Sequence, residues 1–218
     1  MGRGTWLMDL LFPRKCPFCA TILEGEELLC GSCQSTLPWL MGQARERQVD
    51  FAAACLSPLT YTGAVRDSIH RYKFPGNPSY ARCYGLLVAQ CVEDQWTHPL
   101  DQVTWVPVSW RRREKRGFDQ GKRLAAETAA ALKLPLTDTL VKRRHTPQQS
   151  RLTETAQRRA NVLGAYAVRP GAQVEGKRLL LIDDVVTSGA TLSECARILM
   201  QAGAREVVCA ALAQARKK

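Results

Sequence analysis

The sequence lacks an apolar run long enough to cross a bilayer, which takes about 20 helical residues. The patch at residues 6–12 is short, contains Asp9, and is followed by Arg14 and Lys15. The chain also lacks the charge-then-apolar order and the small-residue cleavage site of a secretory signal. We therefore expect a cytoplasmic protein without membrane insertion, in which the nine cysteines stay reduced.

Two common nucleotide-binding motifs are absent as well. No Gly-Lys-Thr/Ser follows a strand and turn, which excludes a Walker P-loop, and no G-x-G-x-x-G follows a strand, which excludes the usual dinucleotide site. Internal repeats and low-complexity tracts are also missing. The three histidines, His70, His98 and His145, are isolated in the sequence, so we assign them no metal or catalytic role.

Positive charge is in excess. The chain has 31 Lys and Arg residues against 20 Asp and Glu, which gives a formal net charge of +11 and a pI near 9.5. The excess is concentrated in residues 105–160, which hold 14 basic and five acidic residues. Such a charge indicates anionic partners: phosphate-rich small molecules, nucleic acid or an acidic membrane surface. Composition alone does not choose among them.

Residues 1–42 form a separate N-terminal unit in our interpretation, because they have little periodic pattern and contain four cysteines. The spacing is two C-x-x-C pairs, and four thiolates satisfy one structural Zn²⁺. A redox dithiol is the weaker alternative, since neither pair lies in a thioredoxin-like βαβ setting. The predicted zinc ligands are Cys16, Cys19, Cys30 and Cys33. The other five cysteines lie in apolar patterns and are predicted to be core residues.

Residues 50–218 predict an α/β domain, because short β-branched runs alternate with amphipathic segments rich in Ala and Leu. The predicted strands are residues 55–61, 103–108, 136–141, 178–182 and 206–213, and the predicted helices are residues 64–72, 80–93, 122–134 and 190–201. A basic loop is expected after the second strand and a long polar loop after the third. A polar loop of that length in a compact domain is usually functional.

The most informative segment is LLLIDDVVTSGAT, residues 179–191. Its apolar run suits a buried parallel strand, so Asp183 and Asp184 are expected at the carboxyl end, where open α/β sheets bind ligands. The hydroxyls, the glycine and the amides of the next helix would form an anion cradle. Taken singly, these features also fit a capped helix with two solvated aspartates. Their combination favours a phosphate site.

This segment resembles the phosphoribosyl pyrophosphate motif of type I phosphoribosyltransferases. The resemblance implies that Asp183 and Asp184 are the catalytic pair, which holds the 2- and 3-hydroxyls of the ribose. It also implies that the 5-phosphate is bound by Val186, Thr187, Ser188, Gly189, Ala190 and Thr191. The ligand would arrive with Mg²⁺.

The basic loop after the strand at residues 103–108 supplies cations for a departing pyrophosphate, and arginine forks suit phosphate oxygens. The predicted pyrophosphate-binding residues are Arg111, Arg112, Arg113, Lys115 and Arg116. The alternatives for this loop are a solvated basic surface or a nucleic-acid patch.

Residues 103–125 are similar to the VPVP…RGFNQ…LA motif of the ComF family, the competence-associated phosphoribosyltransferase-like proteins. The patterns T-x-x-Q-x-x-L from Thr146 and R-x-x-N-V-x-G-A-Y from Arg158 also follow that family, as does Tyr72-Lys73-Phe74. Asp119 replaces the usual Asn, and Tyr166 replaces Phe. The resemblance implies a type I phosphoribosyltransferase-like parallel sheet flanked by helices, with a zinc ribbon before it. It also implies a mobile loop carrying Arg143, Arg144 and Arg151, which closes over the sugar.

Two functions remain open at this point. In the first, phosphoribose is transferred from phosphoribosyl pyrophosphate to an acceptor that the sequence does not specify. In the second, the chain is a non-enzymatic module that binds single-stranded DNA or a partner. The ComF resemblance associates either function with DNA uptake and implies a DNA-uptake helicase as a partner.

Overall fold

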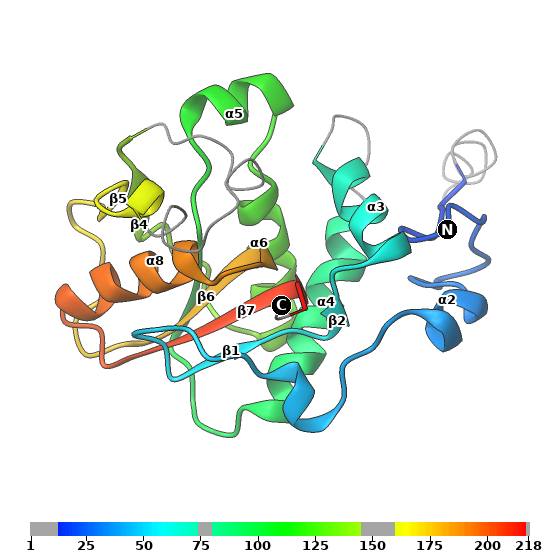
Figure 1. The fold of residues 1–218 in the computed structure, drawn as a ribbon, viewed down its shortest axis with the longest axis horizontal. Helices are drawn as coiled ribbons and strands as arrows, with labels where there is room; N and C mark the ends of the chain where they lie inside the picture. Colours follow the sequence, from blue (N-terminus) through cyan, green and yellow to red (C-terminus); the bar gives the residue numbers. More distant parts are fainter. Residues whose placement is uncertain (1–12, 74–79, 145–159, 217–218) are drawn as a thin grey trace.

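The computed structural model describes residues 13–73, 80–144 and 160–216 (Figure 1). Its helices and strands, in chain order, are α2 (Gly31–Thr36), η1 (Gly42–Arg45), β1 (Ala54–Leu56), β2 (Leu59–Thr60), α3 (Gly63–Tyr72), α4 (Tyr80–Gln95), β3 (Gln102–Trp105), α5 (Trp110–Arg116), α6 (Gln120–Leu132), β4 (Leu140–Lys142), β5 (Tyr166–Val168), β6 (Arg178–Val186), α8 (Ala190–Gln201) and β7 (Glu206–Gln214). This order alternates strands with helices, as predicted.

A parallel sheet with the order β1-β7-β6-β3 forms the centre of the molecule, and β2 also pairs with β7. Strand β6 lies between β7 and β3, and its residues Leu179 to Ile182 are fully buried. A strand covered on both faces reads as a continuous apolar run, which is the pattern seen there. Outside this sheet, β4 and β5 form a two-stranded antiparallel ribbon.

Each face of the sheet has its own apolar core. Leu180 and Ile182 pack with residues of α4 and α6 on one face. Leu179 and Leu181 pack with residues of α8 on the other. Side chains alternate between faces along a strand, and this alternation holds from Leu179 to Ile182. Farther along β6, Val185 packs with the first cluster and Val186 belongs to the second.

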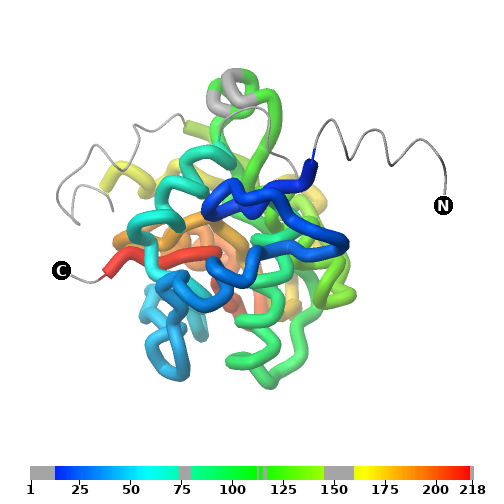
Figure 2. Tube along the Cα trace, turned by 90° about the vertical axis from the view of Figure 1, so that its right-hand side faces the viewer, coloured from blue at the N-terminus to red at the C-terminus, as the bar shows by residue number. Residues whose placement is uncertain are grey.

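The N-terminal cysteine unit is packed against the first of these cores. Phe18 and Leu37 belong to the same apolar cluster as residues of α3 and α4. Figure 2 shows the N-terminal segment (blue) running across the helices coloured teal and green. The unit is therefore in direct contact with the helical layer that lies beside the sheet.

Several element boundaries differ from the sequence predictions. Strand β4 begins at Leu140 and not at residue 136, and β6 ends at Val186 and not at residue 182. The strand predicted at residues 55–61 is divided into β1 and β2, with Pro58, which has no N–H for a ladder, between them. The strand predicted to end at residue 108 ends at Trp105. The segment interpreted as a basic loop contains the helix α5, whose Arg, Lys and Glu residues are good helix formers, and α5 ends at the left-handed Gly117.

Five cysteines outside the N-terminal unit are buried and unbonded, in agreement with their predicted core positions; they are Cys55, Cys83, Cys91, Cys195 and Cys209. In the described part of the chain, none of the helices has the length and apolar character that a bilayer crossing requires.

Candidate functional site

The acidic pair lies within the last part of β6, after the neighbouring strand β3 has ended. Strand β3 pairs with β6 only as far as Trp105 beside Ile182, whereas β7 stays paired through Val186. From Asp183 onward, one edge of β6 therefore has no partner strand from β3. This opening at the carboxyl end of a parallel sheet is where such folds bind ligands.

The two carboxylates have different surroundings. The Oδ2 of Asp184 lies 2.9 Å from the Nζ of Lys73. The charge of Lys142 on β4 is close enough to Asp183 to lower its pKa. The backbone N–H of Asp184 also donates to Oδ1 of Asp183 at 2.8 Å. Asp184 thus forms an ion pair with Lys73, and the charges of Lys73 and Lys142 both act on Asp183.

The pKa of Asp183 is raised to about 7. Burial is the largest cause, and the neighbouring carboxylate of Asp184 raises it further. The backbone hydrogen bond and the charges of Lys73 and Lys142 act in the opposite direction without cancelling the effect. Perturbed carboxyl groups of this kind occur where a protein places charge for binding or catalysis, and also in structural networks.

The turn after β6 forms a small hollow of about 20 Å³ beside Asp183. Thr187, Gly189, Ala190 and Thr191 are among the residues that line it. Gly189 adopts the left-handed conformation with φ of 80° and directly precedes α8. The free backbone N–H groups at the start of that helix favour the binding of an anion.

Val49 covers this turn from the segment that connects the cysteine unit to the sheet. A Cβ added to Gly189 would lie 3.1 Å from Cγ2 of Val49, which is itself buried. Glycine is therefore required at position 189 both by its φ and by its neighbour.

The predicted pyrophosphate-binding residues lie on α5, at the top of Figure 1, which follows β3 after four intervening residues. The side chains of Arg111 and Arg113 are exposed. Those of Arg112, Lys115 and Arg116 lie outside the described side chains. The structure thus places these cations on a short helix at the carboxyl end of β3, and their role in binding stays a prediction.

The predicted closing loop is only partly described. Arg143 and Arg144 are exposed at the end of β4, where their backbone N–H groups donate to the carbonyl of Ala165 at 2.9 and 3.4 Å. Arg151 lies outside the described residues. The β4–β5 ribbon therefore forms the base of this loop, next to Lys142.

Asp119, the departure from the ComF pattern, caps the N-terminus of α6. Its carboxylate accepts a hydrogen bond from the backbone N–H of Lys122 at 3.0 Å. Aspartate and asparagine are equally good at this position. The substitution therefore keeps the local structure that starts α6.

The four N-terminal cysteines meet the requirements of a zinc site. The Sγ atoms of Cys16, Cys19, Cys30 and Cys33 all lie within 4.8 Å of one another, and those of Cys19 and Cys30 are 3.4 Å apart. Tetrahedral ligands with Zn–S bonds of about 2.3 Å would be separated by about 3.8 Å. All four are free thiols, and their arrangement fits one Zn²⁺, which would close this unit structurally.

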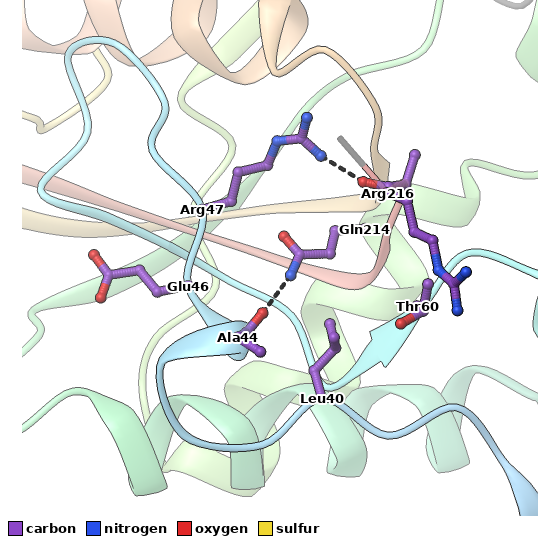
Figure 3. A pocket seen from close by; sticks show the side chains of 8 residues that line it. Leu40, Ala44, Glu46, Arg47, Thr60, Gln214 and Arg216 are labelled. Carbon is purple, nitrogen blue, oxygen red and sulfur yellow. Dashed lines mark hydrogen bonds between the residues drawn. The ribbon is translucent and has the colours of Figure 1, made fainter. Parts of the chain in front are cut away.

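A second cavity, of about 270 Å³, lies beside the end of β7 (Figure 3). Arg47 Nη1 donates to the carbonyl of Ala215 at 2.7 Å, and Gln214 Nε2 donates to the carbonyl of Ala44 at 2.6 Å. The N–H of Ala215 in turn donates to the carbonyl of Val186 at 2.9 Å. The acceptors of these bonds are backbone carbonyls of the protein itself. The walls of the cavity are therefore formed where residues 44–47 are hydrogen-bonded to the end of β7, beside the turn.

Sequence reasoning gave no role to two residues that contact the site. Lys73 was noticed only as part of a basic motif, and Val49 not at all. The motif around Lys73 gave no sign of its partner, because a lysine at the end of a helix is common for reasons of the helix dipole alone. Nothing in the sequence marks Val49.

Two family models match separate parts of the chain. Residues 119–218 match the phosphoribosyl transferase domain, and residues 7–47 match the double zinc ribbon domain. The predicted fold class is thereby confirmed: a parallel sheet of the phosphoribosyltransferase type flanked by helices, preceded by a zinc ribbon with four clustered cysteines.

Curated relatives cover most of the chain. DNA utilization protein YhgH of Escherichia coli is 29% identical over 197 residues, which are 88% of this chain and 80% of that protein. Competence protein F of Haemophilus influenzae is 28% identical over 207 residues, which are 92% of this chain and 84% of that protein. These homologues confirm the resemblance to the ComF family.

Among solved structures, the allosteric regulatory enzyme of purine biosynthesis is 25% identical, with a TM-score of 0.42. The matched part is 64% of this chain and 29% of that chain.

Proposed function

We propose that this protein binds phosphoribosyl pyrophosphate with Mg²⁺ and transfers the phosphoribose. The proposal is supported by the similarity to competence protein F and by the matches to a double zinc ribbon and a phosphoribosyl transferase domain. The observation that carries this proposal is the pair Asp183 and Asp184 at the open edge of β6, followed directly by the hollow at the turn. An adjoining diol site and phosphate site are what a ribose 5-phosphate needs.

In the proposed complex, the carboxylates of Asp183 and Asp184 accept hydrogen bonds from the ribose 2- and 3-hydroxyls. The 5-phosphate lies in the turn from Val186 to Thr191, where the helix N-terminus and the glycine allow a close approach of backbone N–H groups. The α5 cations lie beyond the neighbouring strand and would receive the pyrophosphate. Carboxylate oxygens suit Mg²⁺, which when bound supplies positive charge to the pyrophosphate oxygens.

The reaction breaks the bond between the anomeric carbon and the pyrophosphate oxygen, and the electron pair leaves with pyrophosphate. The acceptor forms the new bond to the anomeric carbon and loses its proton to solvent or to the departing anion. The protein's residues orient the sugar and stabilise the separating charges, which is where most of the rate acceleration of such transfers arises.

Calorimetric titration of phosphoribosyl pyrophosphate with Mg²⁺ tests the binding step. We expect the double variant Asp183→Asn, Asp184→Asn to lose the binding seen in the wild type. The double variant Glu26→Gln, Glu27→Gln removes the same charge from two exposed residues of the ribbon and should bind normally. Equal affinity of the wild type and the Asp variant would refute the assignment. Pyrophosphate release across candidate acceptors then tests turnover.

A second candidate function is supported by the exposed cations and by relatives named for DNA utilization. Arg111, Arg113, Lys122, Arg143 and Arg144 are all exposed. We infer that this surface contacts single-stranded DNA through its phosphates. Binding of labelled oligothymidylate should weaken steeply with salt and persist in the Asp183→Asn, Asp184→Asn variant. Salt-independent binding, or no binding, would contradict this function. The two functions share the exposed cations of α5, which would bind pyrophosphate in the first and DNA phosphates in the second.

A further inference from the structure

The first zinc knuckle is hydrogen-bonded to the last turns of α3. Pro17 and Phe18 lie between the ligands Cys16 and Cys19, and Arg71 Nη2 donates to both of their carbonyls at 2.9 Å. The hydroxyl of Ser68 donates to the carbonyl of Pro17 as well. The backbone that a bound Zn²⁺ would hold in a tight turn is thus the acceptor for two side chains of α3.

Arg71 depends on these two carbonyls. Its Nε is buried and has no hydrogen-bond partner in the described part of the chain, and none of the described ion pairs includes its guanidinium. A partly buried guanidinium with few acceptors is costly to leave unpaired. Any change in the knuckle that moves the Pro17 and Phe18 carbonyls therefore forces Arg71, and the helix that carries it, to adjust.

The end of α3 also contacts the acidic pair, through Lys73. Lys73 lies two residues after Arg71, at the end of α3, where its backbone N–H donates to the carbonyls of Ile69 and His70 at 3.2 Å. Its Nζ is 2.9 Å from Oδ2 of Asp184, and the two side chains are only 25% and 14% exposed. One turn of helix thus carries both the contact with the knuckle and the contact with the acid.

Tyr72, between them, is packed too tightly to absorb a movement. It is fully buried, and its ring meets that of Tyr84 edge-on at 5.3 Å, while Tyr84 contacts Phe18 of the knuckle at 5.6 Å. Its hydroxyl donates to the carbonyl of Gln120 at 2.9 Å, at the start of α6. Close-packed interiors shift as units, so a displaced knuckle displaces Lys73.

We propose that the zinc knuckle positions Lys73 against Asp184 through Arg71, so that zinc occupancy and ligand binding at the acidic pair are coupled. Arg71 is the positioning residue, and Lys73 is the group that meets the ligand site. The ligand part of this inference rests on the proposed function. Because coupling between two sites is reciprocal, a ligand that binds better to the zinc-loaded form must also make zinc harder to remove.

The first test measures the position of Lys73 without any ligand. The ¹³C chemical shift of the Asp184 carboxyl is recorded at fixed pH in the zinc-loaded wild type and in four variants. The variants are Arg71→Met, Arg71→Lys, Lys73→Met and the control Arg66→Met. Arg66 is an exposed residue of the same helix whose described ion pair is with Asp67, its sequence neighbour. We expect the Asp184 signal to move in Arg71→Met and in Lys73→Met, to stay in Arg66→Met, and to return partly toward the wild-type position in Arg71→Lys.

The second test measures the coupling itself. The equilibrium affinity for zinc is measured by competition with a chelator, with and without phosphoribosyl pyrophosphate and Mg²⁺. We expect the ligand to raise the zinc affinity of the wild type and of Arg66→Met by about fivefold or more, within the usual range of such couplings. In Lys73→Met this increase should be lost. This comparison does not depend on whether Arg71→Met folds.

The outcomes separate the two proposals. An Asp184 signal that is unchanged in a folded Arg71→Met protein overturns the positioning role. A ligand that binds the wild type and leaves its zinc affinity unchanged overturns the coupling. If the wild type binds no phosphoribosyl pyrophosphate and the Asp184 signal still responds to Arg71→Met, the proposed function fails and the structural link stands.

Discussion

Val49 lies against Gly189, so that a Cβ at position 189 would come within 3.1 Å of Cγ2 of Val49. A residue from the segment after the zinc ribbon therefore covers the turn on which the proposed phosphate site depends. The same segment is fastened to the sheet by Arg47 and Gln214. The shape of the turn is thus fixed from outside the local motif.

Gly189→Ala should destabilise the protein and impair phosphate binding. The left-handed backbone costs a non-glycine residue about 1–2 kcal/mol, and the contact with Val49 adds crowding to that strain. The matched control is Gly171→Ala, because Gly171 has φ of 79° and no atom within 4 Å of an added Cβ. Urea unfolding should show a larger loss for Gly189→Ala than for Gly171→Ala. Equal losses would show that Val49 does not constrain the turn.

Gly85→Ala should destabilise the packing of α4 on α6. An added Cβ would lie 2.3 Å from Cβ of Glu127 and 2.9 Å from backbone atoms of Glu127 and Thr128. Overpacking of this kind costs about 1–3 kcal/mol. Gly31→Ala, at a helical position with open space around it, should be neutral or stabilising. Thermal unfolding should show a lower melting temperature for Gly85→Ala than for Gly31→Ala, and a harmless Gly85→Ala would contradict the close contact.

The stability of the protein should depend on pH through Asp183. Burial raises its pKa in the folded state to about 7 from a model-peptide value of 3.8. Between these values the folded state binds the proton more readily, so this group lowers stability as pH rises from 4 to 7. Asp183→Asn removes the effect, and its stability relative to wild type should increase between pH 5 and pH 8. Denaturant titrations that show a constant difference would contradict this.

Zinc content should follow the four ribbon cysteines and no others. We expect about one zinc per chain in the wild type and a clear loss in Cys33→Ser. Cys83→Ser is the control, because Cys83 is also buried and free but lies in α4 and is not one of the four clustered thiols. Elemental analysis after dialysis measures both. Full zinc retention by Cys33→Ser would argue against a four-thiolate site.

The parts of the candidate sites that could be predicted from the sequence are those whose residues are close together along the chain. The apolar run of β6, the two acids and the turn before α8 follow one another directly, so local pattern was enough to locate them. The zinc ligands are similar: two C-x-x-C pairs specify their own geometry, and the sulfur atoms come together as expected.

The features that could not be predicted depend on packing between distant segments. The contacts of Lys73 with Asp184 and of Val49 with Gly189 arise only when α3 and the connecting segment are placed beside the sheet. The helix α5 was missed for a different reason. Its charge suggested a solvated loop, although Arg, Lys and Glu are also good helix formers.

A lysine near each acid gives the pair its own counter-charge before any ligand arrives. A bare divalent cation would have to compete with an ammonium group already held 2.9 Å from Asp184. A ligand that brings anionic oxygens together with its cation can instead offer the displaced ammonium a new partner. In the proposed complex, this competition would favour a metal ion that arrives with the phosphorylated ligand over the metal ion alone.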